Sequence, residues 1–186
     1  ARIAPNAVFI AQSRKEFIKN FLPVFIEVYN EICGGSEVVS LEYFSNVSNN
    51  EDEFMELLKT SQEDDRRLRR MTCGVHKDDL AFKIGDYPLR KFGSQGQQKT
   101  FLVALKLAQL VFLEKATGVK PILLLDDIFD KIDDKRVRAL MSRVTDGTFG
   151  QIFITDTHMG RIPEMFTSIG ADVRVFEVIH GEVNTL

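Results

Sequence analysis

The chain has 186 residues, of which 44% are hydrophobic and 27% are charged, and its formal net charge is −3 at pH 7. This is the composition of an ordinary soluble globular protein, and the negative balance excludes a global positive field that would attract nucleic acid or a membrane surface. The apolar stretches are too short and too interrupted to span a bilayer, and no signal peptide is visible. The chain has two cysteines, Cys33 and Cys73, which have neither the spacing of metal ligands nor that of a disulfide framework. This usage is typical of a protein in a reducing cytoplasm.

The first part of the chain has the apolar spacing of a long helix. From Phe17 onward, apolar residues recur at helical intervals, and the pattern extends back to about residue 2. Pro23 predicts a kink in this helix, and Gly34-Gly35 predicts its end.

A strand at 37–44 and a second helix at 51–70 follow. We therefore predict a mainly helical subdomain over residues 1–70, truncated at its N-terminus.

The remainder, residues 71–186, alternates strands and helices, which is typical of an α/β head. Two short apolar runs bounded by turn residues predict buried parallel strands, and an apolar helix lies before them. The expected elements are a hairpin at 79–92, a buried helix at 99–116, strands at 121–126 and 151–155, a helix around 137–144, a short helix at 160–169 and a hairpin at 172–183.

Two aspartates stand at the end of the first of these strands. Asp126 and Asp127 occupy the carboxyl end of the strand, where ligands bind in open α/β sheets. Successive side chains of a strand point to opposite faces, so the two carboxylates suit two different tasks better than joint chelation of one ion. An apolar strand that ends in an acid is typical of nucleotide hydrolases, where the acid supports Mg²⁺ on the phosphates. The alternative is an aspartate that only begins a turn.

The stretch FGSQGQQKT, residues 92–100, precedes the apolar helix and holds more polar residues than a simple N-cap requires. The start of a helix presents unpaired N–H groups and the positive end of the dipole, which together form an anion site. Gly93 and Gly96 remove side chains that would block a phosphate. Further hydrogen-bond donors come from Ser94, Gln97 and Gln98.

Several of these motifs occur in the order found in one family of ATPases. SQGQQK before an apolar helix, then ILLLDD, then DKIDD resemble the signature, Walker B and D-loop motifs of an ABC-type ATPase head. Residues 74–99 resemble the corresponding segment of the RecF family of bacterial recombination-repair ATPases, with Val75 where proline is usual and Lys77 for arginine. Residues 14–43 resemble the family's arm. The resemblance covers the whole chain as a C-terminal half, and it implies an α/β fold: the C-terminal part of an ABC-type head plus a helical arm.

The resemblance implies a role for each matching residue. Asp126 would support Mg²⁺, and Asp127 would polarise the hydrolytic water, where many ABC proteins have glutamate. Asp133 matches the D-loop acid that crosses the dimer interface. The signature residues would contact the γ-phosphate of a nucleotide held by the partner subunit; they are Ser94, Gln95, Gly96, Gln97 and Lys99.

Two features depart from a complete ABC-type ATPase. The switch histidine usually follows the threonine of the next strand directly, but FITDTH leaves Thr155, Asp156 and His158 as candidates for this role. No glycine in the chain is followed by lysine, so a P-loop is absent from these 186 residues. In RecF-like proteins the P-loop lies upstream of the arm. We therefore expect the 186 residues alone neither to hydrolyse ATP nor to bind it tightly.

For the full-length protein, the resemblance implies a slow DNA-dependent ATPase of DNA replication, recombination, repair and the SOS response. ATP and Mg²⁺ would join two molecules head to tail on DNA at single-strand gaps, and hydrolysis would release the DNA. The implied partners are DNA, mediator proteins of the RecR and RecO type, and a second copy of the protein. The resemblance also implies a cytoplasmic location and no membrane partner.

An arginine cluster lies near the end of the second predicted helix. Arg66, Arg67, Arg69 and Arg70 follow three acidic residues, so that Glu63–Arg67 and Asp65–Arg69 have the spacing of helical ion pairs. The favoured interpretation is a solvated helix face, and the functional alternative is a contact with the DNA backbone.

Three other functions remain as alternatives. The chain could belong to another ABC-type head, such as that of an SMC-like protein, although long heptad repeats are not found. A metal-dependent nuclease site could be formed by Asp126, Asp127, Asp130, Asp133 and Asp134, but two-metal sites need carboxylates that converge, and adjacent residues of a strand diverge. The third alternative is an interaction module whose motifs are unused.

Overall fold

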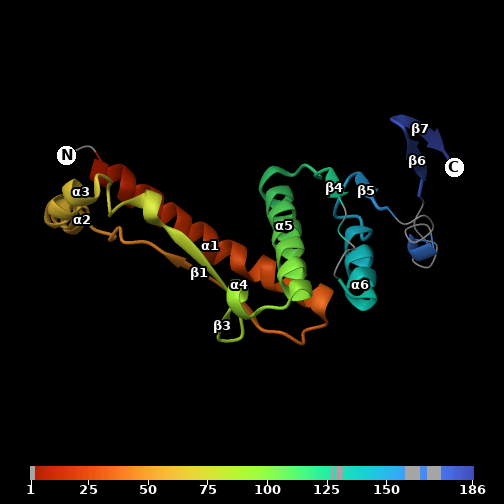
Figure 1. Ribbon diagram of the computed structural model, residues 1–186, viewed down its shortest axis with the longest axis horizontal. Helices are drawn as coiled ribbons and strands as arrows, with labels where there is room; N and C mark the ends of the chain where they lie inside the picture. The colour runs from red at the N-terminus through yellow and green to blue at the C-terminus, as the bar shows by residue number, and fades with distance from the viewer. Residues whose placement is uncertain (1–2, 127, 129–131, 158–163, 167–172) are drawn as a thin grey trace. The chain divides into compact units, whose positions relative to one another are not determined.

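The computed structural model describes residues 3–126, 128, 132–157, 164–166 and 173–186 (Figure 1). The chain divides into two compact units. The first combines Ala1–Glu27 with Glu37–Gly93, and the second combines Val28–Ser36 with Ser94–Leu186. Among the described residues, no helix has the length and apolar character needed to cross a bilayer.

The first helix, α1, runs from Ile3 to Cys33 and continues through Pro23. It ends as predicted, because Gly34 adopts a φ of +68° and its N–H donates to the carbonyl oxygen of Asn30 at 2.8 Å.

A three-stranded antiparallel sheet follows in the first unit, in the order β1-β2-β3. Its strands are β1 (Val39–Phe44), β2 (Asp79–Ile84) and β3 (Tyr87–Pro88). Gly85, with a φ of +56°, begins the turn of the predicted hairpin. The second strand of this hairpin is shorter than predicted, because Leu89–Phe92 form the helix α4.

The pairing of β1 with β2 decides where the compact units divide. Val39 lies opposite Ile84 and Phe44 lies opposite Asp79, so the sheet joins segments from both sides of the expected boundary at residue 70. The first unit consequently extends to Gly93. An arm over residues 1–70 and a head over 71–186, as functional domains, stay a prediction.

The predicted helix at 51–70 is two helices, α2 (Glu51–Thr60) and α3 (Gln62–Leu68). The hydroxyls of Thr60 and Ser61 donate to carbonyl oxygens of the preceding turn at 3.0–3.2 Å. Such bonds compete with the regular helical ladder and favour a break or a bend. The apolar side of α2 nevertheless reaches a core, because Phe54 is buried against α1 with Ala4, Ala7, Val8, Ala11 and Val47.

Asp78 anchors three segments of the first unit. Its side chain is 4% exposed and accepts hydrogen bonds of 2.5 Å from Arg14 of α1 and from the hydroxyl of Tyr43 in β1. Burial alone would raise the pKa of Asp78, but hydrogen bonds from Ser45, Tyr43 and Arg14 outweigh it, so the pKa is lowered. The first aspartate of the HKDD stretch is therefore a structural residue of this unit.

The second unit contains the predicted α/β elements. They are α5 (Gln95–Thr117), β4 (Leu123–Asp126), α6 (Asp134–Val144), β5 (Ile152–Thr155) and the hairpin of β6 (Phe176–Ile179) with β7 (Glu182–Thr185). Strands β4 and β5 are parallel, as predicted. Of the helix expected at 160–169, only residues 164–166 are described, and they are helical; the rest lies outside the described residues.

The two parallel strands and the apolar helix of this unit are each buried on one face only. The prediction that they are buried on all sides is therefore wrong. On β4, Leu123 and Leu125 are buried, whereas Leu124 is 71% exposed and its β5 neighbour Phe153 is 51% exposed. On α5, Leu107 is buried but Leu102 is 55% exposed. The strands and the apolar helix are therefore not buried all round, because the described part of the chain covers only one face of each.

We predict that Asp78→Asn destabilises the first unit by about 1–3 kcal/mol, because two donors lose a charged acceptor. Since the pKa of Asp78 is lowered in the folded state, its contribution is fully present above the unfolded pKa of about 4 and is lost as the pH falls through the folded pKa. Hydrogen exchange of the β1 and β2 amides measures the effect.

The matched control is Asp79→Asn, which removes an exposed neighbouring carboxylate. The prediction is contradicted if both variants exchange alike at pH 7, or if the difference between wild type and Asp78→Asn stays the same at pH 3.

Candidate functional site

The start of α5 is held by a complete capping box. The N–H of Gln97 donates to Ser94 Oγ at 3.2 Å, and the N–H of Ser94 donates to Gln97 Oε1 at 2.9 Å. These two bonds satisfy orphan donors at the helix start and explain why serine and glutamine occur three residues apart. The polar stretch therefore has a structural role that the sequence analysis did not assign to Gln97.

The capped end of α5 still presents polar groups to solvent. Ser94 and Gln95 are exposed, while Gly96, Gln97 and Lys99 are partly exposed. A hydroxyl that accepts a hydrogen bond keeps its own proton to donate, so Ser94 can cap the helix and bind an anion at once. The geometry is compatible with a phosphate at this end, and the predicted contacts of these five residues with a nucleotide stay predictions.

The second part of the site lies where β4 and β5 end. Asp126 is the last residue of β4, and the register places it opposite Thr155, the last residue of β5. The Thr155 hydroxyl donates to Asp126 Oδ1, and both side chains are exposed. Asp156 follows Thr155 and is partly buried. The other predicted residues of this edge, Asp127 and His158, lie outside the described residues.

The oxygen ligands at this edge of the sheet fit Mg²⁺, the ion that the family resemblance implies. Mg²⁺ takes oxygen ligands, keeps several waters, and is typically held by one or two carboxylates together with substrate phosphates. The exposed carboxylate of Asp126, oriented by Thr155, matches this pattern. Within the described residues, no group of three or more His, Cys, Asp or Glu side chains forms a metal site by itself, so the phosphates would have to complete the coordination.

The third part of the site is the start of α6. Asp133 is the N-cap of this helix and accepts from the N–H of Arg136 at 3.0 Å. The guanidinium of Arg136 lies 3.2 Å from Asp133 Oδ2 through Nε, and its Nη1 donates to the hydroxyl of Thr100 in α5 at 3.4 Å. Residue spacing links Arg136 to Asp133, but no sequence signal indicates the contact with Thr100.

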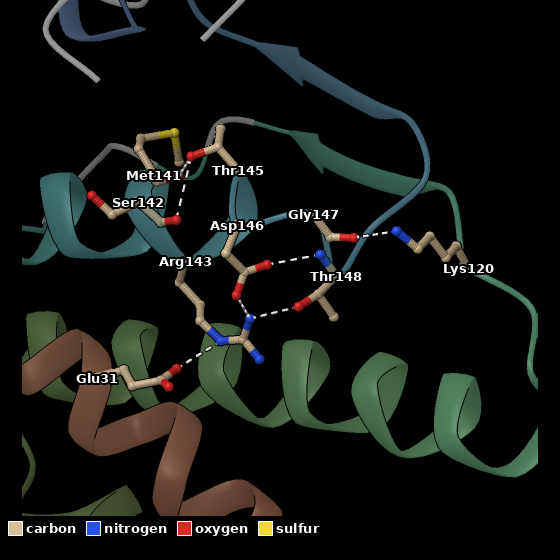
Figure 2. A network of polar contacts seen from close by, with 9 residues as sticks. All are labelled: Glu31, Lys120, Met141, Ser142, Arg143, Thr145, Asp146, Gly147 and Thr148. Carbon is tan, nitrogen blue, oxygen red and sulfur yellow. Dashed lines mark hydrogen bonds and ion pairs between the residues drawn. The ribbon is translucent and has the colours of Figure 1, made fainter. Parts of the chain in front are cut away.

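A second arginine network holds the loop that leads into β5 (Figure 2). Arg143 at the end of α6 pairs with Glu31 of α1 at 2.6 Å, with Asp146, and with the Thr148 hydroxyl at 2.9 Å. Burial would raise the pKa of Asp146, but hydrogen bonds from Thr148 and the charge of Arg143 lower it. The loop is thus tied to two helices immediately before the strand that carries Thr155, and sequence analysis missed this network.

The arginine cluster belongs to the first unit. Arg66, Arg67, Arg69 and Arg70 are all exposed. The partners differ from the two predicted ion pairs. Arg67 forms an ion pair with Asp64 at 2.7 Å, and Asp65 accepts hydrogen bonds from the N–H and the hydroxyl of Thr72. Arg69 ends α3 with a φ of +53°. Their exposure agrees with a solvated face and leaves the DNA contact a prediction.

The chain is similar to known proteins in sequence and in structure. No family model matches the chain. The DNA replication and repair protein RecF of Flavobacterium johnsoniae is 47% identical over 169 residues, and that of Parabacteroides distasonis is 45% identical over 177 residues. These matches cover 91% and 95% of this chain but 46% and 48% of the relatives.

Two kinds of solved structure are similar. A structure of the recombination mediator RecF with ATP has a TM-score of 0.76 at 26% identity and covers 98% of this chain and 48% of its own. A structure from work on the ATP-driven dimerization of SMC ATPases has a TM-score of 0.55 at 12% identity over 95% of this chain and 88% of its own, which shows the fold alone.

The fold is therefore that of part of an ABC-type ATPase head of the kind found in SMC ATPases. Within this class, the chain belongs to the RecF family. It spans about half the length of the curated relatives it matches.

We predict that Ser94→Ala weakens the start of α5 by about 1 kcal/mol, because the N-cap acceptor is lost, whereas Ser94→Asp retains it. Hydrogen exchange of the amides of residues 96–98 measures the cap. Equal exchange in wild type and Ser94→Ala would contradict the structural role of Ser94.

Proposed function

We propose that this chain supplies the signature, Walker B and D-loop parts of a RecF-type DNA repair ATPase. The observation that carries the proposal is identity of 41–47% with RecF proteins over more than nine tenths of the chain. The arrangement of the second unit supports it, because the start of α5, the β4–β5 edge and the start of α6 all belong to that unit.

The start of α5 acts on a nucleotide held by another subunit. The 186 residues have no P-loop, so the cradle for the nucleotide must come from elsewhere in a RecF-length protein. The exposed, glycine-containing end of α5 can approach the γ-phosphate closely, with Ser94, Gln95 and Lys99 as donors. Two molecules therefore pair head to tail when ATP is bound, each closing over the nucleotide of the other.

The β4–β5 edge carries out hydrolysis. Asp126, held by Thr155, supports Mg²⁺, which when bound neutralises charge on the phosphates. Asp127, next in sequence, orients and polarises the attacking water. Catalysis is then positional and electrostatic, without a covalent intermediate. Asp156 and His158 are the other candidates for a residue that senses the terminal phosphate.

The ATP-bound dimer grips DNA at single-strand gaps, and hydrolysis releases it. The similar RecF structures are described as components of a RecFOR pathway, which supports mediator proteins of the RecO and RecR type as partners. We place the full-length protein in the cytoplasm as a slow DNA-dependent ATPase, with roles in replication, recombination and the SOS response.

In the full-length protein, Asp127→Asn is expected to stall hydrolysis and to preserve ATP-driven dimerisation, because the variant keeps the site's shape but loses the charge that polarises water. Turnover and sedimentation with and without ATP measure the two effects. Asp86→Asn, in an exposed turn of the first unit, is the control. Unchanged turnover of Asp127→Asn would remove this residue from its role.

Neutralising Arg66 and Arg70 to glutamine is expected to weaken DNA binding uniformly across sequences and to lower the slope of log affinity against log salt by about 1–2. Lys59→Gln, at an exposed lysine paired with Glu56, is the matched control. An unchanged salt slope in the arginine variant would leave the cluster as a solvated face.

A further inference from the structure

We propose that Arg136 is a positioning residue that couples the D-loop acid Asp133 to the signature helix α5. This inference rests on the proposed function and extends it, because neither the motifs nor the family resemblance assigns a role to Arg136 or Thr100. Through Arg136, the group that reaches toward a second subunit and the helix that closes over its nucleotide are linked by one side chain.

The guanidinium of Arg136 contacts both helices at once. Its Nε lies 3.2 Å from Asp133 Oδ2, and its Nη1 donates to Thr100 Oγ1 at 3.4 Å. The other carboxylate oxygen of Asp133 accepts from the backbone N–H of Arg136 at 3.0 Å. Both oxygens of Asp133 are thus oriented by Arg136, one through its backbone and one through its side chain.

Thr100 is close to the proposed phosphate contact. It lies six residues after Ser94, which corresponds to about 9 Å along the helix axis. Its side chain faces the interior, since Thr100 is 1% exposed although it belongs to a polar stretch. The contacts of Arg136 with Asp133 and Thr100, hereafter the Arg136 tie, therefore fix the rotation of the first turns of α5 and their position along the helix axis. They do not occupy the surface that would meet a nucleotide.

The exposure of the three side chains decreases from one end of the tie to the other. Asp133 is 59% exposed, the Arg136 side chain is 18% exposed, and Thr100 is buried. Charge-assisted bonds in a partly desolvated place are stronger than those on an open surface. Asp133 consequently stays accessible to another molecule while its orientation depends on a buried anchor in α5.

The chemical consequence is a dependence of turnover on a residue that does not touch the substrate. If Asp133 and α5 must meet the other subunit together, then loss of the tie lowers the fraction of ATP-bound dimers with both parts in place. ATP binding at the P-loop of either subunit is unaffected, because the tie contributes nothing to it. Hydrolysis should fall while the KM for ATP stays nearly constant.

The test uses the full-length protein, four single variants and the double variant Thr100→Val with Arg136→Met. Thr100→Val removes the acceptor with little change in shape, and Thr100→Ser keeps the hydroxyl. Arg136→Met removes the donor, and Arg138→Met removes an exposed arginine from the same helix as a matched control. The measurements are kcat and KM for ATP, together with sedimentation in the presence of ATP.

We expect Thr100→Val and Arg136→Met each to lower kcat about tenfold with KM changed less than about twofold, as for a loss of alignment. Thr100→Ser and Arg138→Met should retain wild-type kcat. The double variant should be no slower than the slower single variant, because both changes break the same tie.

The outcomes separate this inference from the function on which it rests. Wild-type kcat in Thr100→Val, or equal losses in Thr100→Val and Thr100→Ser, would overturn the role of Arg136 while Asp127→Asn still stalls hydrolysis. A wild-type protein without ATP hydrolysis would overturn both proposals. If Arg136→Met does not fold, the comparison of the two threonine variants decides the matter alone.

Discussion

The parallel pairing of β4 with β5 is the constraint on which the candidate site depends. Its register brings Asp126 beside Thr155 at the carboxyl edge of the sheet, although 28 residues separate them in the sequence. One strand carries the acid, and the other carries the hydroxyl that orients it. The α6 helix and the loop anchored by Arg143 connect these strands, so their packing fixes the register and hence the chemistry of the edge.

The element types and their order could be predicted from the sequence because they depend on local patterns. The spacing of Val137, Leu140, Met141 and Val144 predicts α6, and all four are buried. The boundary between units could not be predicted, because the β1–β2 pairing joins distant segments. The sequence analysis overestimated the burial of Leu124 and Leu102. An apolar pattern indicates which side chains are suited to burial, but it does not indicate whether another element covers them.

In the candidate site, too, local sequence motifs indicate individual residues but not the contacts between distant segments. The end of β4 and the starts of α5 and α6 hold the residues that the motifs indicate. The capping box of Ser94 and Gln97 has the usual three-residue spacing, but the sequence analysis interpreted these residues only as phosphate contacts. The contact between Arg136 and Thr100 is not visible there, because nothing in either segment specifies the other. Asp78 has a comparable position in the first unit, where a residue within a family motif serves to hold α1, β1 and β2 together.

The uncovered face of β4 and β5 has a consequence for handling the protein. Leu124 and Phe153 stand side by side on it, and Ile122 just before β4 is also 61% exposed. Within the described residues, these two strands also have no further strand paired to their outer edges. Apolar surface beside unpaired strand edges promotes intermolecular β-pairing, so we expect concentrated preparations of the 186-residue chain to self-associate unless a solubilising partner shields the face.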